Sequence, residues 1–213
     1  MSDSIFSLIS RIRSLEGEIG EIVDRRVSEF LEFNSKSDKE WFSELCFCIL
    51  TANSSAELGI KIQSSVGEGF LTLPRNRLEE ELRKAGHRFW RKRAEFIINA
   101  RKYANIKEIV LERIEVGGVF GAREWLVRDV KGLGYKEASH FLRNVGYLDV
   151  AILDRHILAL MAQHGMIEVP RTMTRRRYLE IEQKFLELSE MAGMKPGVLD
   201  LYMWYMKTGR VLK

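Results

Sequence analysis

The chain has 213 residues, 46% of them hydrophobic, which is enough for one sizeable core or for two small lobes within one unit. Lys and Arg number 34 against 30 Asp and Glu, so the net charge of +4 is compatible with nucleic-acid binding without requiring it. This composition excludes a disordered tail protein.

The sequence predicts neither a membrane segment nor a metal cluster. No stretch approaches the roughly 20 apolar residues of a membrane span, and the first residues lack the pattern of a secretion signal. We therefore expect a cytoplasmic protein without membrane contact. The only cysteines are Cys46 and Cys48, which are predicted to be structural thiols. Two cysteines are too few for an iron–sulfur cluster or a zinc site unless another chain contributes ligands.

Apolar residues recur at three- and four-residue steps along the chain, which predicts an all-α fold. The first thirty residues are typical of one amphipathic helix or a broken pair, and Ser37 with Glu40 forms a capping-box pattern that opens the next helix. Residues 147–153 resemble a strand but have no partner strand, so an extended connector is expected. Further helices are expected at 55–65, 77–85, 89–103, 122–130, 135–145, 154–164, 174–191 and 196–207.

A tight junction between two helices lies at Lys131-Gly-Leu-Gly134. Its two glycines permit positive φ and a close backbone approach, and the amides that open the second helix can hold a phosphate. The alternative is a junction that serves only packing. Lys136 follows at the start of the second helix, and eighteen positions later Asp154 is placed to cap another helix.

From about Phe120 to His164 this arrangement resembles the helix-hairpin-helix DNA glycosylases. The resemblance implies an all-α, two-lobed fold with the active site in the cleft between the lobes. It also implies that residues 1–213 form a single unit of two interleaved helical lobes, with the helix-hairpin-helix at residues 122–146. Double-stranded DNA containing a damaged base is the implied partner, and a monomer is expected because one extruded base requires no twofold symmetry.

The resemblance also assigns roles to individual residues. Lys136 matches the nucleophile of the family and Asp154 its catalytic aspartate. The remaining matches are DNA contacts at Gly132, Gly134 and His156, and the backbone carbonyls of Arg128, Val130 and Leu133, which hold a monovalent cation in relatives.

Two further positions are candidates for DNA contact. Asn53 lies in a segment similar to the family loop whose Asn or Gln fills the gap left by an extruded base, although an Asn that merely ends a helix is an equally good interpretation. Phe89, among several basic residues, is a candidate wedge between bases, with a core position as the alternative.

The proposed chemistry needs these residue types. A carboxylate at Asp154 would stabilise the electron-poor C1′ as the base departs, and a neutral Lys136 amine could attack that carbon. Burial and a helix N-terminus both disfavour the ammonium form of such a lysine. The resulting Schiff base permits β-elimination, so a lysine nucleophile predicts strand nicking in addition to base removal.

The short chain without cluster cysteines resembles the compact type-2 8-oxoguanine DNA glycosylases of archaea and some bacteria, which implies 8-oxoguanine as the excised base. Asp200 and Trp204 are four residues apart on one helix face, where they could bind and stack on a guanine. His140 is expected to form the opposite wall of the pocket, and the terminal carboxylate of Lys213 could accept the N7 hydrogen of 8-oxoguanine. The alternatives are a core role for Trp204 with a frayed Lys213, a cluster-free glycosylase for oxidised pyrimidines, and a non-catalytic DNA-binding module.

Overall fold

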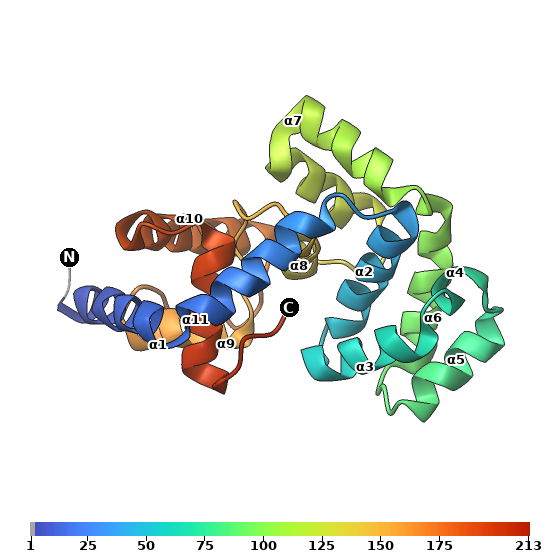
Figure 1. The fold of residues 1–213 in the computed structure, drawn as a ribbon, viewed down its shortest axis with the longest axis horizontal. Helices are drawn as coiled ribbons and strands as arrows, with labels where there is room; N and C mark the ends of the chain where they lie inside the picture. Colours follow the sequence, from blue (N-terminus) through green and yellow to red (C-terminus); the bar gives the residue numbers. More distant parts are fainter. Residues whose placement is uncertain (1–2) are drawn as a thin grey trace. The chain divides into compact units, whose positions relative to one another are not determined.

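The computed structural model describes residues 3–213, and these residues form helices joined by turns and connectors, with no β-strand among them (Figure 1). The all-α prediction is confirmed. No helix in residues 3–213 is long and apolar enough to cross a membrane. In chain order the helices are α1 (Asp3–Phe33), α2 (Asp38–Thr51), α3 (Ala56–Val66), α4 (Gly69–Thr72), α5 (Arg75–Lys84), α6 (Trp90–Ala100), the 3-10 turn η1 (Arg101–Tyr103), α7 (Ile106–Asp129), α8 (Tyr135–Asn144), α9 (Arg155–Gln163), α10 (Arg175–Ala192) and α11 (Pro196–Thr208).

The chain divides into two compact units. One unit consists of residues 33–145, and the other combines residues 146–213 with the described residues before 33. Hydrogen bonds join α1 to the C-terminal part of the chain: the backbone carbonyl of Ser4 lies 2.8 Å from His164 Nδ1, and the Arg13 guanidinium donates to the Met191 carbonyl at 3.5 Å. The core of this unit is therefore built from the two ends of the sequence.

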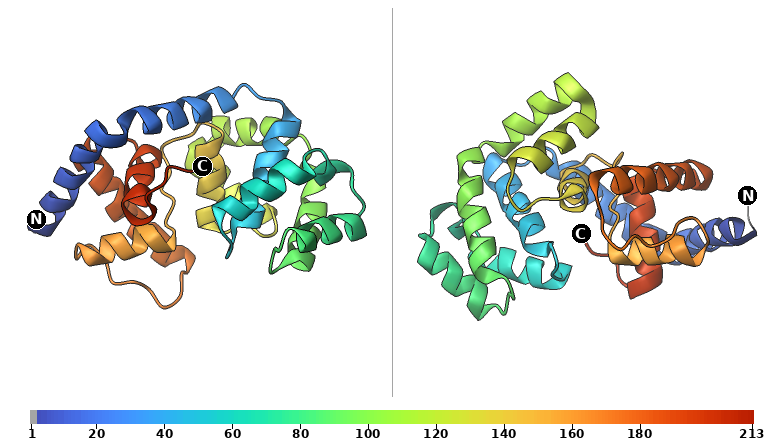
Figure 2. Two further views of the ribbon diagram at one scale, coloured as in Figure 1. Left: turned by 60° about the horizontal axis from the view of Figure 1, so that its bottom comes forward. Right: turned by 180° about the vertical axis from the view of Figure 1, so that it is seen from behind.

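Helix α2 is the centre of the 33–145 unit. It packs against α3, α6, α7 and α8, and nearly every residue from Trp41 to Thr51 is buried (Figures 1 and 2). Cys46 and Cys48 point to different sides of the helix but are both fully buried, because α2 is covered all round. Burial raises the pKa of the Cys46 thiol well above its ordinary value, which suits a structural thiol.

The start of α2 follows the capping pattern in the sequence. The Glu40 carboxylate accepts the Ser37 backbone N–H at 2.9 Å and the Ser37 hydroxyl at 2.8 Å. These hydrogen bonds stabilise the charged form and lower the pKa of Glu40. The expected start of this helix is confirmed.

The sequence left open whether the first thirty residues form one amphipathic helix or a broken pair, and helix α1 decides between them. It is continuous over 31 residues, and its inner face buries an apolar stripe at three- and four-residue steps, so it is one helix and not a broken pair. That stripe consists of Leu8, Ile12, Leu15, Ile19 and Val23.

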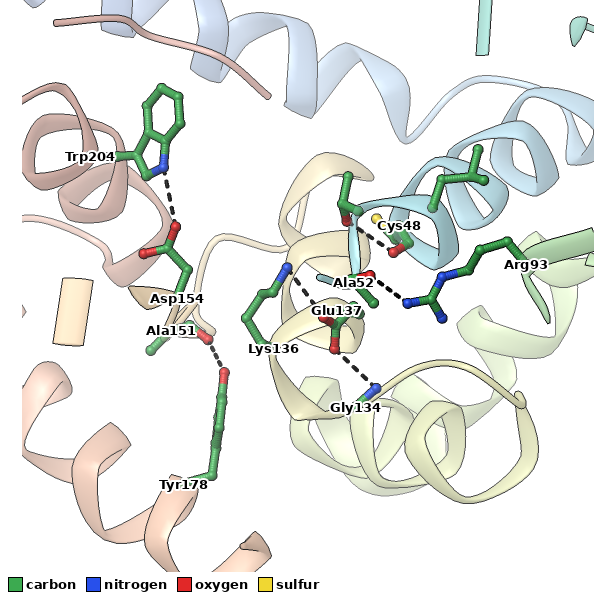
Figure 3. Close-up of polar contacts among 12 residues, drawn as sticks. Cys48, Ala52, Arg93, Gly134, Lys136, Glu137, Ala151, Asp154, Tyr178 and Trp204 are labelled. Atoms are coloured by element: carbon green, nitrogen blue, oxygen red, sulfur yellow. Dashed lines mark hydrogen bonds and ion pairs between the residues drawn. The ribbon is translucent and has the colours of Figure 1, made fainter. Parts of the chain in front are cut away.

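Residues 147–153 form no strand and are largely buried, as expected for a connector inside the core. The Tyr178 hydroxyl of α10 donates to the Ala151 carbonyl at 2.8 Å, and the Ala151 amide donates to the Glu182 carboxylate at 3.4 Å (Figure 3). Side chains of α10 therefore satisfy backbone groups that a neighbouring strand would otherwise bind.

Most expected helices lie within about two residues of those observed. Helix α7 consists of two helical segments that meet at Gly118: the helix expected at 122–130 lies in the second segment, and the first segment, from Ile106, was not expected. Gly118 adopts φ 66° and ψ −176°, so the chain kinks there and resumes as helix. The short helix α4 was also not expected from the sequence.

The hairpin between α7 and α8 is a tight turn in which the Leu133 N–H donates to the Val130 carbonyl at 3.3 Å and the Leu133 side chain is buried. Gly132 has φ +97°, and a Cβ at this position would lie 2.5 Å from the Phe96 ring. Gly134 does not share the positive φ expected for both glycines: it is extended, at φ −95°. Its lack of a side chain instead leaves room for the Glu137 carboxylate, 3.0 Å from where its Cβ would be.

Replacing Gly132 by Ala should destabilise the 33–145 unit by at least about 2 kcal/mol, because it combines a left-handed φ with overlap against the Phe96 ring. Urea unfolding measures this change. Gly117→Ala is the control, since no atom lies within 4 Å of its Cβ position and its φ is not positive. It should not destabilise the protein and should stabilise it by at most about 1 kcal/mol. Equal stability of both variants would contradict the strain argument.

Candidate active-site residues

Lys136 is the second residue of α8, directly after the hairpin. Its side chain is 25% exposed, and its Nζ lies 3.2 Å from Glu137 Oε1 (Figure 3). The other Glu137 oxygen accepts the Gly134 backbone N–H at 3.1 Å. One carboxylate thus ties the predicted nucleophile to the hairpin.

Sequence reasoning missed Glu137, although its signal was present: a Glu at the third position of a helix commonly reaches back to the N-cap amide. The negative charge of Glu137 also offsets the unfavourable position of a cation in the first turn of a helix. The expectation that burial and the helix N-terminus favour a neutral Lys136 therefore omitted an opposing ion pair.

His140 lies one turn further along α8 and is buried. Its ring contacts Phe47 of α2 edge to face, with the ring centroids 5.5 Å apart. This contact fixes the imidazole in the 33–145 unit.

Asp154 is the N-cap of α9 in the other unit. Its Oδ1 accepts the backbone N–H groups of His156 at 2.8 Å and Ile157 at 2.9 Å. Its Oδ2 accepts the indole N–H of Trp204 at 3.2 Å (Figure 3). Three donors therefore fix the orientation of this carboxylate, and one of them comes from a predicted base-pocket residue.

The remaining candidates of this unit lie on α9, on α11 and at the chain end. The rings of His156 and Trp204 meet edge to face at 6.1 Å, so His156, Asp154 and Trp204 form one cluster. Asp200 is buried one turn before Trp204, and Lys213 is partly buried.

Asn53 follows the end of α2 with φ 57°, the one positive φ of a non-glycine residue among those the structure describes. The left-handed conformation shows that Asn53 does end a helix, and Asn tolerates it better than most residues. Its side chain is exposed. Both interpretations of this residue therefore remain compatible with its position.

Phe89 precedes α6 and is 36% exposed, so it is not a core residue. Next to it, His87 is buried: its Nε2 lies 2.9 Å from the Leu50 carbonyl, and its Nδ1 accepts the Phe89 backbone N–H at 3.1 Å. The buried Arg93 donates to the Ala52 carbonyl (Figure 3). Sequence reasoning missed both His87 and Arg93, because these contacts span 37 and 41 residues.

Among residues 3–213, no group of three or more His, Cys, Asp or Glu side chains could hold a metal ion. The chemistry available from the candidate residues is that of an amine at Lys136 and an oriented carboxylate at Asp154.

The family model described as 8-oxoguanine DNA glycosylase matches residues 23–194. The chain belongs to this family. The 8-oxoguanine DNA glycosylase/AP lyase of Methanocaldococcus jannaschii is 58% identical over 208 residues, which cover 97% of this chain and 99% of that protein. The resemblance inferred from the hairpin and Asp154 is thereby confirmed and extends over nearly the whole sequence.

Two solved structures share the fold. The crystal structure of the Methanocaldococcus jannaschii glycosylase/lyase in complex with a 15mer DNA containing 8-oxoguanine has a TM-score of 0.94 and 56% identity, and the match covers 97% of this chain and 100% of that one. The 8-oxoguanine DNA glycosylase of Thermotoga maritima has a TM-score of 0.91 and 44% identity, and the match covers 98% of this chain and 100% of that one. The family fold is therefore present, including the elements that carry Lys136 and Asp154.

The buried His87 predicts a pH dependence of stability. Desolvation lowers the pKa of His87 from its ordinary value of 6.5; the hydrogen bond to the Leu50 carbonyl opposes this shift, and the nearby Arg93 adds to it. As the pH falls below 6.5, the unfolded chain takes up this proton before the folded protein does. The free energy of unfolding should therefore fall by up to about 1.4 kcal/mol per pH unit until the folded pKa is reached.

Urea unfolding of the wild type and His87→Gln between pH 7.5 and pH 5 isolates this contribution from the other titrating groups. The wild type should lose stability more steeply than the variant on acidification. Parallel curves would show that His87 does not bind its proton more weakly in the folded protein.

Proposed function

We propose that this protein is a bifunctional 8-oxoguanine DNA glycosylase/AP lyase, which excises 8-oxoguanine from duplex DNA through a Schiff base at Lys136. The observation that carries the proposal is a lysine amine in the first turn after a glycine hairpin, in a chain 58% identical to an 8-oxoguanine DNA glycosylase/AP lyase. Glu137 fixes the starting position of that amine.

Base removal begins when the damaged nucleotide leaves the stack, with Asn53 and Phe89 occupying the vacated space. As the C1′–N9 bond breaks, positive charge develops on the sugar and the fixed carboxylate of Asp154 stabilises it. The neutral amine of Lys136 then bonds to C1′, and the departing base takes the electron pair of the broken bond.

Strand nicking follows from the covalent intermediate. Loss of a proton from nitrogen and opening of the sugar ring give a Schiff base between Lys136 and C1′. Removal of a C2′ proton then expels the 3′ phosphate, which breaks the C3′–O bond. Gly132, Gly134 and His156 contact the DNA backbone. The Gly134 amide is bound to Glu137, so its contact depends on the close approach that a residue without a side chain allows.

Four residues are proposed to recognise the base. The buried Asp200 accepts the N1 and N2 hydrogens of the guanine, and Trp204, held by its hydrogen bond to Asp154, stacks on the ring. His140 is also proposed to contact the base. A backbone oxygen of Lys213 accepts the N7 hydrogen, which 8-oxoguanine has and guanine lacks.

The backbone carbonyls of Arg128, Val130 and Leu133 would hold a monovalent cation. The Val130 carbonyl accepts one hydrogen bond, from the Leu133 N–H, and keeps a second lone pair for a cation. Such an ion would add positive charge at the hairpin, where a phosphate is expected.

Lys136→Gln should abolish the covalent adduct that forms when borohydride is added to the protein with duplex DNA containing 8-oxoguanine opposite cytosine. Borohydride reduces the Schiff base to a stable bond, and the variant has no amine at this position. Base release should fall by at least about a thousandfold.

Lys131→Gln is the matched control, since Lys131 is an exposed lysine of the same hairpin. It should weaken DNA binding without removing the adduct. An adduct of undiminished yield with Lys136→Gln would reject Lys136 as the nucleophile. If the wild type forms no adduct and releases no base, the same assay with oxidised pyrimidines distinguishes another lesion from a non-catalytic DNA-binding module.

Asp154→Asn should reduce excision of 8-oxoguanine by about 10²–10³-fold, because the negative charge near the developing cation is lost. The melting temperature should fall only modestly, because the Asn oxygen keeps the helix cap while its amide nitrogen cannot accept the Trp204 indole N–H. Single-turnover excision assays and thermal unfolding measure the two effects. Asp149→Asn, at an exposed carboxylate paired with Lys195 at 3.0 Å, is the control and should leave excision unchanged. Equal activity of the two variants would remove Asp154 from the mechanism.

A further inference from the structure

The side chains of Asn53 and Phe89 are both exposed and come from segments far apart in the sequence. Buried side chains connect these two segments by hydrogen bonds to backbone groups. Asn53 follows α2, and Phe89 precedes α6. Beneath them lie the buried residues His87 and Arg93, which are 2% and 7% exposed. Each of these two residues bonds to a carbonyl at the end of α2, at Leu50 and Ala52 respectively.

The hydrogen bonds of His87 define its protonation and its tautomer. A backbone N–H can only donate, so Nδ1, which bonds to the Phe89 amide at 3.1 Å, carries no proton. A backbone carbonyl can only accept, so Nε2, 2.9 Å from the Leu50 carbonyl, carries one. The imidazole is therefore neutral, and it links the backbone of Phe89 directly to the end of α2.

Arg93 adds a second link. Its guanidinium donates to the Ala52 carbonyl, next to Asn53, and lies 5.9 Å from the centroid of the Phe89 ring. It also lies 5.7 Å from the ring of Phe96, the residue that contacts Gly132. Burial lowers the pKa of Arg93, while the negative charge of Glu137 opposes this shift.

Apolar residues would fill this space without the desolvation cost of an imidazole and a guanidinium. They could not bond the carbonyls at the end of α2 or the Phe89 amide. The hydrogen bonds of these polar side chains therefore fix the distance between the two exposed residues more narrowly than apolar packing would.

We propose that His87, supported by Arg93, is a positioning residue that holds Asn53 and Phe89 as a preformed pair for opening the DNA stack. The inference rests on the proposed function and adds residues that touch neither the base nor the sugar. A preformed pair loses little conformational freedom when it enters DNA, so more of its contact energy offsets the cost of extruding a paired base.

The test compares two substrates: 8-oxoguanine opposite cytosine, and 8-oxoguanine opposite an abasic analogue, where no base pair must be broken. His87→Gln keeps a donor for Leu50 and loses the acceptor for Phe89, whereas His87→Asn does the reverse. Each variant should excise the paired base about three- to tenfold more slowly, the effect of one hydrogen bond, and the unpaired base at nearly the wild-type rate.

His164→Gln is the matched control, since His164 also bonds to a distant backbone carbonyl, that of Ser4, but belongs to the other unit. It should not change the ratio of the two rates. Equal slowing on both substrates by the His87 variants would overturn the positioning role, because a folding or catalytic defect does not depend on base pairing. Failure of the wild type on both substrates would instead overturn the proposed function.

A second experiment does not depend on the folding of the His87 variants. Asn53→Ala, Phe89→Ala and the double variant alter exposed side chains only. If the two residues act as one preformed pair, the double variant should slow excision of the paired base by less than the product of the single effects. Fully multiplicative effects would overturn the inference.

Discussion

The left-handed turn at Gly132 is the constraint on which the start of α8 depends. Its φ of +97° lets the chain reverse between α7 and α8, and the absence of a side chain lets the Phe96 ring close over the turn. Two residues later Gly134 begins α8 with its amide bound to Glu137, and the same carboxylate lies 3.2 Å from the Lys136 amine. The position of Lys136, the proposed nucleophile, thus follows from backbone geometry four residues earlier.

Helix N-termini carry both groups of the proposed reaction, with opposite electrostatic consequences. Asp154 is an N-cap, where backbone amides and the positive end of the helix dipole stabilise a carboxylate. Lys136 lies in the first turn of α8, where the same dipole disfavours a cation, and Glu137 compensates. The same local feature, a helix N-terminus, therefore binds the Asp154 carboxylate directly, whereas at Lys136 it is accompanied by the Glu137 ion pair.

Features encoded in short stretches of sequence could be predicted, and features that depend on distant contacts could not. The capping box at Ser37, the cap at Asp154 and the hairpin glycines depend on neighbouring residues, and the structure has a cap or turn at each. The first segment of α7, from Ile106 to the kink at Gly118, was not predicted from the sequence, whereas the second segment was. His87 gave no signal, since a lone histidine has no recognisable pattern until the Leu50 carbonyl is placed beside it.

Asn53 shows why two interpretations of one residue need not compete. A residue that ends a helix in the left-handed conformation does so through its backbone, and its side chain takes no part in ending the helix. Here that side chain is exposed, while the preceding carbonyl, that of Ala52, is bound by the buried Arg93. The backbone role therefore fixes the position from which the side chain can act. A loop residue whose backbone is held in place and whose polar side chain is exposed is therefore a better candidate for inserting into DNA than a residue of a flexible loop. Its backbone is already ordered before DNA binds, so binding costs less conformational entropy.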